Sequence, residues 1–259
     1  MYDRLILVEG ASDEEVFRSL AKTLKADIAR RGVGFINLRG GKNHHFVSQE
    51  ILTYLEHSQG RTWCVLDSDE MSKEEIDSLY RRFSDITNTK LFILRKREIE
   101  NYLLHPHAIL SEINRKRIVG GLKPTVTIEE VDSAIRGLDG ILREECIRLR
   151  SRAELLPHIR FPHGIGTDEV AGELETKLRE MEALLKSLPV ALDAIRKEIS
   201  IMNLTTLFER VPGTFALEQI YGHFEVAFTK VDSGTLAGQL PEADIDNELK
   251  EILKQATSA

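Results

Sequence analysis

The chain has 259 residues, of which 42% are hydrophobic and 30% are charged. This length and composition suit one large domain, or a core domain with a smaller one. The sequence holds no run of about 18 apolar residues, which argues against a helix that spans a membrane. Its first residues lack a signal-peptide pattern, so we expect a cytoplasmic location. The net charge of −7 disfavours bulk attraction to DNA but allows a local basic groove in an enzyme.

Four short apolar segments in the first hundred residues predict β-strands. They are Leu5–Val8, Val33–Leu38, Trp63–Leu66 and Leu91–Leu94. Continuous apolar runs are typical of strands buried on both faces. Apolar residues at helical spacing separate these strands, including a predicted helix over Phe46–Leu55. Capping-box patterns at Ser12–Glu15 and Ser72–Glu75 indicate where two helices begin. The alternation predicts an α/β fold with a mainly parallel sheet flanked by helices.

The pattern changes after the fourth strand, where only helical periodicity remains. We predict a catalytic core over residues 1–105 and an all-helical insertion domain over residues 106–203. Residues 204–259 then return to the core and end in a helix near Asp244–Leu253. The segment Gly222–Leu240 gives no clear pattern.

Acidic residues follow two of the predicted strands. Glu9 comes directly after the first strand with Asp13 one turn further, and Asp67 and Asp69 follow the third strand. Because ligands of an open parallel sheet bind beyond the carboxyl ends of its strands, we expect these carboxylates to converge. Close carboxylates repel one another unless a cation neutralises them, and oxygen ligands without His or Cys favour Mg²⁺ or Mn²⁺. The alternative is that Asp13 is only a helix N-terminal charge and Asp67–Asp69 an ordinary turn.

Several motifs together resemble the TOPRIM nucleases of the overcoming-lysogenization-defect (OLD) family. Val8–Asp13 and Leu66–Asp69 resemble the acidic motifs of the TOPRIM domain found in topoisomerases, primases and small nucleases. Arg97–Leu104 resembles a stretch after the fourth strand of OLD nucleases, and Val211–Gly213 resembles part of their later Pro-Gly-Lys motif. The resemblance implies a TOPRIM, Rossmann-like core, a helical insertion and a closing C-terminal helix.

The resemblance also implies a DNA endonuclease that uses two divalent ions, Mg²⁺ or Mn²⁺. Glu9, Asp13, Asp67 and Asp69 would then be catalytic and bind metal, and Glu9 would be the best candidate to take the proton of the attacking water. Glu98 or Glu100 would add a further metal ligand. The sequence does not decide between them, because they would share a face on a strand but diverge at a helix start.

One position departs from the family. Thr214 stands where OLD nucleases have a lysine, and its hydroxyl cannot supply positive charge to the phosphate. Either Lys42 or Lys230 substitutes, or the alignment is wrong, or the enzyme is slow. Lys42 lies at a glycine-rich turn before a helix, and Arg95, Lys96 and Arg97 adjoin the proposed site, so we expect these four residues to bind the nucleic-acid backbone.

Two other functions fit parts of the pattern. Cys64–Asp69 resembles the strand end of haloacid-dehalogenase-type phosphatases, in which the first Asp is a nucleophile, although that motif usually opens the fold. A catalytically weak TOPRIM module that only binds DNA or a partner would fit Thr214.

Partners are implied by the family resemblance. OLD proteins place an ATPase domain before this region, and the chain holds no Walker A loop. We therefore expect DNA and an ATPase as partners, the ATPase being either upstream in a longer chain or a separate subunit. A homo-oligomer is a further option, and the family suggests phage defence or DNA processing as the setting.

Overall fold

The computed structural model describes residues 3–38, 53, 55, 60–69, 71–123, 125–159 and 170–258. Apart from Thr53 and Leu55, the predicted helix over Phe46–Leu55 lies outside these residues. The chain forms two compact units, one of Met1–Gly137 with Pro212–Ala259 and the other of Leu138–Val211.

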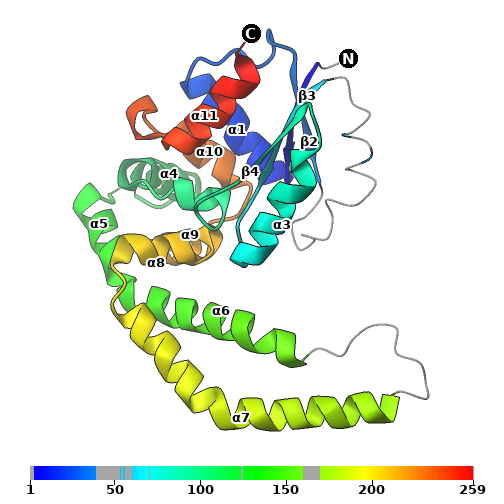
Figure 1. Cartoon of the computed structure of the whole chain (residues 1–259). Coiled ribbons are helices and arrows are strands. Elements are labelled where there is room, and N and C mark those ends of the chain that lie inside the picture. The colour runs from blue at the N-terminus through cyan, green and yellow to red at the C-terminus, as the bar shows by residue number, and fades with distance from the viewer. Residues whose placement is uncertain are drawn as a thin grey trace. The chain divides into compact units, whose positions relative to one another are not determined.

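A four-stranded parallel sheet forms the centre of the first unit (Figure 1). Its strands are β1 (Arg4–Val8), β2 (Val33–Asn37), β3 (Arg61–Leu66) and β4 (Thr89–Ile93), in the order β2-β1-β3-β4. All three pairings are parallel, with Leu7 opposite Ile36 on one side and Cys64 on the other. The carboxyl ends of the strands therefore lie at one edge, and the predicted α/β fold with a mainly parallel sheet is confirmed.

Apolar side chains of the two central strands build the core on both faces of the sheet. Figure 1 shows α1 (Ala11–Thr23) on one face and α3 (Lys73–Ser84) on the other. The face toward α3 buries Leu7 and Cys64 against Leu79 and Phe83. Strand side chains that are buried on both faces explain why these segments are continuously apolar in the sequence.

The starts of α1 and α3 differ in how well the sequence predicts them. The box at Ser72–Glu75 is confirmed, because the Ser72 hydroxyl accepts from the Glu75 amide and the Glu75 carboxylate from the Ser72 amide. The box at Ser12–Glu15 is wrong. Helix α1 already begins at Ala11, and Asp13 Oδ2 accepts from the Gly10 amide over 2.9 Å. Only Glu9 and Gly10 separate β1 from α1, so Asp13 takes the position expected for Glu15.

Further helices complete the first unit. They are the 3₁₀ turns η2 (Ile99–Tyr102) and η3 (Glu242–Asp244), with α4 (Pro106–Val119), α5 (Ile128–Gly137), α9 (Gly213–His223), α10 (Asp232–Gly238) and α11 (Asn247–Thr257). Helix α10 packs closely on α1, α4 contacts α10, and α5 contacts α9. Thus α4 and α5 join this unit through their own contacts, and the chain re-enters it at Pro212. The division at residues 105 and 203 stays a prediction.

The second unit consists of α6 (Asp139–Ile159), α7 (Val170–Ser200) and α8 (Leu204–Arg210). The Arg143 guanidinium on α6 donates to the carbonyl oxygens of Ile199 and Met202 and so secures the end of α7. Between residues 106 and 203, the described part of the chain contains helices and no strand, as the sequence predicts. None of the described helices is long and apolar enough to cross a membrane.

Gly213 allows α9 to approach η2 closely, and this contact yields a prediction. A Cβ atom at Gly213 would lie 2.4 Å from the Asn101 amide nitrogen and 2.6 Å from the Glu100 carbonyl carbon, both rigid backbone atoms. Gly213→Ala should therefore lower the free energy of unfolding by about 1–3 kcal/mol, the usual cost of overpacking. The measurement is chemical denaturation. Gly222→Ala is the matched control, because Gly222 lies in the same helix and a Cβ atom added there would meet none of the described neighbouring atoms within 4 Å. Equal effects of both substitutions would contradict this account.

Candidate active site

Glu9 and Asp67 meet at the carboxyl edge of the sheet. Glu9 follows β1 and Asp67 follows β3, and these strands are neighbours. The Asp67 amide donates to Glu9 Oε1 over 2.8 Å. The first and third strands therefore bring their acidic residues together, as expected from the parallel sheet.

Asp13 joins them from the first turn of α1. The residue is 7% exposed, and its carboxylate accepts from the Gly10 amide and, over 3.1 Å, from the Ser12 hydroxyl. These hydrogen bonds fix the Asp13 carboxylate beside the β1–α1 junction. Asp13 therefore caps its own helix and also lies near the strand ends. Its position is compatible both with a charge at the helix N-terminus and with a metal ligand.

The η2 turn directs the side chains of Glu98 and Glu100 toward different partners. The Ile99 amide donates to Asp67 Oδ1 over 3.0 Å and thereby joins η2 to the end of β3. Glu100 is fully buried and its Oε1 accepts from the Ser233 hydroxyl over 3.3 Å. Glu98 Oε2 instead accepts from the Thr214 hydroxyl over 3.1 Å and lies near the Thr214 amide at 3.4 Å. The two acids diverge, as residues at a helix start do.

Asp69 is held through its backbone. Its φ of 39° lies in the left-handed region, and its amide donates to the Arg97 carbonyl over 3.0 Å. The Ser68 hydroxyl donates to the Lys96 carbonyl over 3.0 Å. The loop after β3 is thus attached to the segment after β4, which fixes Asp67 and Asp69 relative to η2.

Glu9, Asp13, Asp67, Asp69 and Glu100 together form what we call the acidic cluster. Loss of water around these carboxylates is the largest cause of the raised pKa values of Glu9, Asp67 and Glu100. Burial raises the pKa of Glu9 to about 7, with repulsion from Asp69 and Asp13 acting in the same direction. Burial likewise raises the pKa of Glu100 to about 7. The pKa of Asp67 is raised well above its usual range by burial and then by Asp13 and Glu9, and burial also raises the pKa of Asp13. A cation at this edge of the sheet would relieve the repulsion.

Lys230 brings positive charge to the acidic cluster. It precedes α10, whose Ser233 contacts Glu100, and α10 packs on α1. Burial alone would lower the pKa of Lys230, but attraction from Glu100 and from other carboxylates raises it. Lys230 therefore lies close enough to the acidic cluster to interact with Glu100, Asp67 and Asp13. Its packing partners lie far away in the sequence, so sequence reasoning could only name it as one of two candidates.

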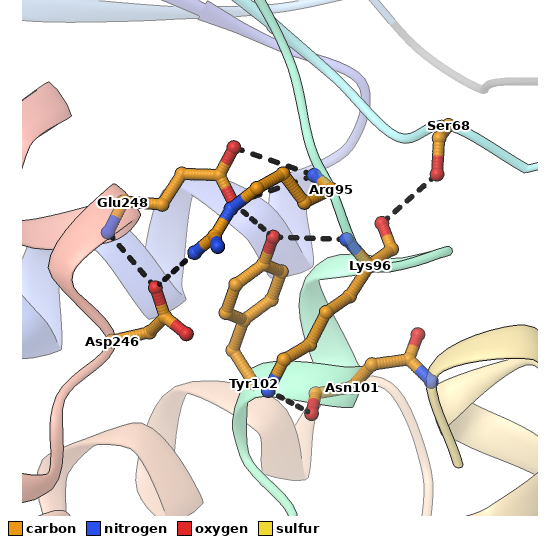
Figure 2. Close-up of polar contacts among 7 residues, drawn as sticks. All are labelled: Ser68, Arg95, Lys96, Asn101, Tyr102, Asp246 and Glu248. Carbon is orange, nitrogen blue, oxygen red and sulfur yellow. Dashed lines mark hydrogen bonds and ion pairs between the residues drawn. The ribbon is translucent and has the colours of Figure 1, made fainter. Parts of the chain in front are cut away.

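Tyr102 and α11 hold the segment after β4 in place (Figure 2). The Tyr102 hydroxyl donates to Glu248 and accepts from the Lys96 amide, the latter over 3.1 Å. Arg95 pairs with Asp246 over 2.9 Å and with Glu248 over 3.2 Å. This network connects the start of α11 to the segment that carries the Ser68 and Asp69 contacts.

The predicted nucleic-acid-binding residues have varied surroundings. Arg95 is engaged by α11 but stays 67% exposed on its side chain. The Lys96 ammonium donates to the Asn101 carbonyl over 3.3 Å and lies 4.6 Å from the Tyr102 ring centre. The Arg97 carbonyl holds Asp69. Lys42 lies outside the described residues. Their binding to nucleic acid stays a prediction, and these internal contacts give Arg95 and Lys96 a structural role as well.

The acidic cluster fits a hard divalent cation in its donor chemistry. Glu9, Asp13, Asp67, Asp69 and Glu100 offer only carboxylate oxygens, which suit Mg²⁺ or Mn²⁺. Glu100 Oε2 is buried without a hydrogen-bond partner within the described structure, as expected of a ligand oxygen. Across the described ranges, no three His, Cys, Asp or Glu side chains already form a group that could hold a metal ion.

The raised pKa values predict that divalent cations displace protons. Glu9 and Glu100, with pKa values of about 7, are partly protonated at neutral pH in the metal-free protein. Metal binding requires carboxylates, so Mn²⁺ should release at least about one proton per chain at pH 7, about one from Glu9 and Glu100 together and more from Asp67, and fewer at higher pH. Calorimetry in buffers of different ionisation enthalpy measures this release.

The same pKa values give the pH dependence of metal-free stability. Because the pKa values of Glu9 and Glu100 are raised on folding, their protonated forms favour the folded state, and stability falls as pH rises through their folded pKa of about 7. Mn²⁺ should therefore raise the melting temperature more at pH 8 than at pH 5. A Mn²⁺-induced shift that is no larger at pH 8, together with no proton release at pH 7, would contradict the assignment.

Comparison with known proteins agrees with the acidic motifs. A family model described as "Overcoming lysogenization defect protein-like, TOPRIM domain" matches residues 1–69. This segment includes Glu9, Asp13, Asp67 and Asp69, and TOPRIM domains generally bind divalent metals in enzymes that act on nucleic acids. Comparisons with curated proteins and with solved structures gave no match. Residues 1–69 are therefore similar to the TOPRIM domain of OLD-like proteins, as the motifs predict.

Proposed function

We propose that this chain is a divalent-metal-dependent DNA endonuclease that cleaves phosphodiester bonds. The observation that carries the proposal is the convergence of Glu9, Asp13, Asp67 and Glu100, from three separate segments, beside Lys230. A stable fold has no need of so many partly desolvated carboxylates at one edge, because each raises the cost of ionising the others. A site for cations and phosphate explains the arrangement.

Five carboxylates would hold the metal. Glu9, Asp13, Asp67, Asp69 and Glu100 would bind Mg²⁺ or Mn²⁺, two ions per site, with Glu98 as the second choice for the last ligand. Bound ions would polarise the phosphate and activate a water. Glu100 is preferred over Glu98 because it is buried beside Asp67 and Asp13, whereas Glu98 binds Thr214.

Two residues would act on the substrate directly. Glu9, whose pKa of about 7 lies near the working pH, would accept the proton of the attacking water. Lys230 would stabilise the negative charge that builds on the phosphate, a role that Thr214 cannot fill. Arg95, Lys96, Arg97 and Lys42 would bind the DNA backbone, and the predicted helical insertion over 106–203 would help to grip it.

Plasmid nicking tests the proposal. The wild-type chain should nick supercoiled plasmid with Mg²⁺ or Mn²⁺ but not with EDTA, and Glu9→Gln, Asp67→Ala and Glu100→Gln should each lower the rate at least a hundredfold, since each removes a ligand or the base. Glu14→Gln is the control. Glu14 lies in the same helical turn as Asp13 but pairs with Arg18 over 2.8 Å instead of joining the cluster. Unchanged nicking by Glu9→Gln and Asp67→Ala would refute the site.

The assay also separates the alternative functions. Release of phosphate from p-nitrophenyl phosphate without action on plasmid would favour a phosphatase with Asp67 as nucleophile. Tight DNA binding without cleavage, with each of Mg²⁺, Mn²⁺ and Ca²⁺, would favour a binding module.

Lys230 gives a separate prediction. Lys230→Met should lower the nicking rate about a hundredfold or more, as loss of a charge-stabilising donor does. Thr214→Lys added to Lys230→Met should restore part of it, because the Thr214 side chain already lies beside Glu98 at the site. Lys73→Met is the control, because Lys73 is exposed at the start of α3. Calorimetry should show Mn²⁺ binding as tight as in the wild type or tighter. Full activity of Lys230→Met would exclude Lys230 from the reaction.

The proposed setting follows the family resemblance. The nuclease would work in the cytoplasm with an ATPase, either a domain upstream in a longer chain or a separate subunit. Phage defence or DNA processing would be the purpose. Nicking that depends on ATP and an added ATPase would support that pairing.

A further inference from the structure

Lys230 lies in a turn that leads into α10 and that its neighbours hold closed. The Asp232 amide donates to the Thr229 carbonyl over 2.8 Å, and the Ser233 amide donates to the Lys230 carbonyl over 3.2 Å. The Asp232 carboxylate adds two bonds, because its Oδ2 accepts from the Thr229 amide over 2.7 Å and from the Thr229 hydroxyl over 2.9 Å. The backbone on both sides of Lys230 is therefore fixed.

Helix α4 attaches this turn to the rest of its unit through Lys116 and Arg117. The Lys116 ammonium lies 2.7 Å from Asp232 Oδ2 and donates to the Ala227 carbonyl over 2.9 Å. Because the side chains of Lys116 and Asp232 are only 19% and 13% exposed, water screens this ion pair less than one on the surface. Arg117 donates to the Phe224 carbonyl over 2.7 Å. Helix α4 thus holds the segment that carries Lys230 at three points.

These contacts also keep Asp232 from competing for Lys230. The two residues lie close in the chain and carry opposite charges. Burial alone would raise the pKa of Asp232, but the bonds from Lys116 and Thr229 lower it, so this carboxylate is ionised and already paired. The carboxylates that attract Lys230 most strongly lie at the site instead, and they are Glu100, Glu98, Asp67 and Asp13. Lys116 thereby leaves the charge of Lys230 to the acidic cluster.

The position of Lys230 depends on its backbone. Within the described residues, its ammonium forms no direct hydrogen bond or ion pair of its own, although carboxylates of the site attract it. A lysine side chain is long and flexible, so a side chain without a direct partner is placed by the turn that carries it. The same ammonium remains available for a ligand.

We propose that Asp232 and Lys116 are positioning residues that hold Lys230 toward the acidic cluster. Helix α10 supplies a second support, because it packs on α1 and its Ser233 donates to Glu100. The placement of Lys230 stands on these contacts alone, and only its consequence for catalysis rests on the proposed nuclease function.

Site-resolved trypsin cleavage of the full chain tests the placement without reference to activity. Trypsin must take the lysine side chain into its specificity pocket, so a closed turn protects the bond after Lys230. Asp232→Ala and Lys116→Met should each raise the rate of cleavage after Lys230 about tenfold, as loss of a cap or of its partner does. Cleavage after Lys254 of α11 is the internal reference, because global unfolding would raise both rates together.

Glu130→Ala is the matched control for Asp232→Ala. At the start of α5, in the same unit, the Glu130 carboxylate accepts from the Thr127 amide over 2.8 Å, three residues back, as Asp232 does from Thr229. Its loss removes a comparable cap but no contact of the turn that holds Lys230. Cleavage after Lys230 should therefore stay as slow as in the wild type.

A double-mutant cycle tests the consequence for catalysis. Asp232→Ala should lower the plasmid-nicking rate about tenfold when Lys230 is present, since misplacing a charged group weakens its action on the substrate. In Lys230→Met it should change the rate hardly at all, because Asp232 acts through Lys230. A general structural defect would lower both rates by the same factor. Calorimetry should show that Asp232→Ala binds Mn²⁺ as tightly as the wild type or more tightly.

Two results would overturn the proposal. One is cleavage after Lys230 that is equally slow in the wild type, Asp232→Ala and Lys116→Met. The other is an equal loss of nicking by Asp232→Ala with and without Lys230. A wild type that does not nick plasmid would count against the proposed function instead, and the cleavage rates would still decide whether Asp232 and Lys116 place Lys230.

Discussion

Asp67 is the residue through which three parts of the site are held together. Its amide donates to Glu9, which follows β1, and its carboxylate accepts from the Ile99 amide, which begins η2. One residue after β3 thereby fixes the end of the neighbouring strand on one side and the turn that carries Glu100 on the other. The parallel sheet makes this possible, because it places the ends of β1, β3 and β4 at a common edge.

The arrangement costs stability and indicates function. Carboxylates that lose water and face one another resist ionisation, and the raised pKa values of Glu9, Asp67 and Glu100 express that cost. The fold offsets part of it with backbone amides, the Ser233 hydroxyl and the charge of Lys230. Carboxylates that are held close together despite their mutual repulsion are characteristic of sites whose ligand supplies the positive charge.

The sequence predicts those features that depend on local order. Continuous apolar runs locate the strands, and because parallel strands share an edge, the meeting of Glu9 and Asp67 can be expected from the sequence. The start of α1 differs from the prediction because the strand-to-helix connection is only two residues long, which the pattern around Ser12 does not reveal. Glu98 and Glu100 could not be separated, since their directions depend on a 3₁₀ turn that the Thr214 and Ser233 contacts orient.

Contacts between residues far apart in the chain could not be predicted from the sequence. The run Arg95–Arg97 suggests a basic surface, yet Arg95 contacts carboxylates at the start of α11 (Asp246 and Glu248), about 150 positions further along the chain. Lys230 reaches the acidic cluster only because α10 packs on α1. No local pattern encodes either contact.

The path of the chain has a consequence for how the protein is made. Glu9, Asp67 and Glu100 are synthesised early, but Gly213, Lys230 and Ser233 follow only after the helical unit Leu138–Val211. A nascent chain that ends within this unit contains Glu9, Asp67 and Glu100. It lacks Lys230, and it lacks Gly213 and Ser233, which contact Glu100. On the ribosome, the complete acidic cluster with Lys230 can therefore form only after the helical unit has been translated, so an interrupted translation product would carry the early carboxylates without Lys230 and Ser233.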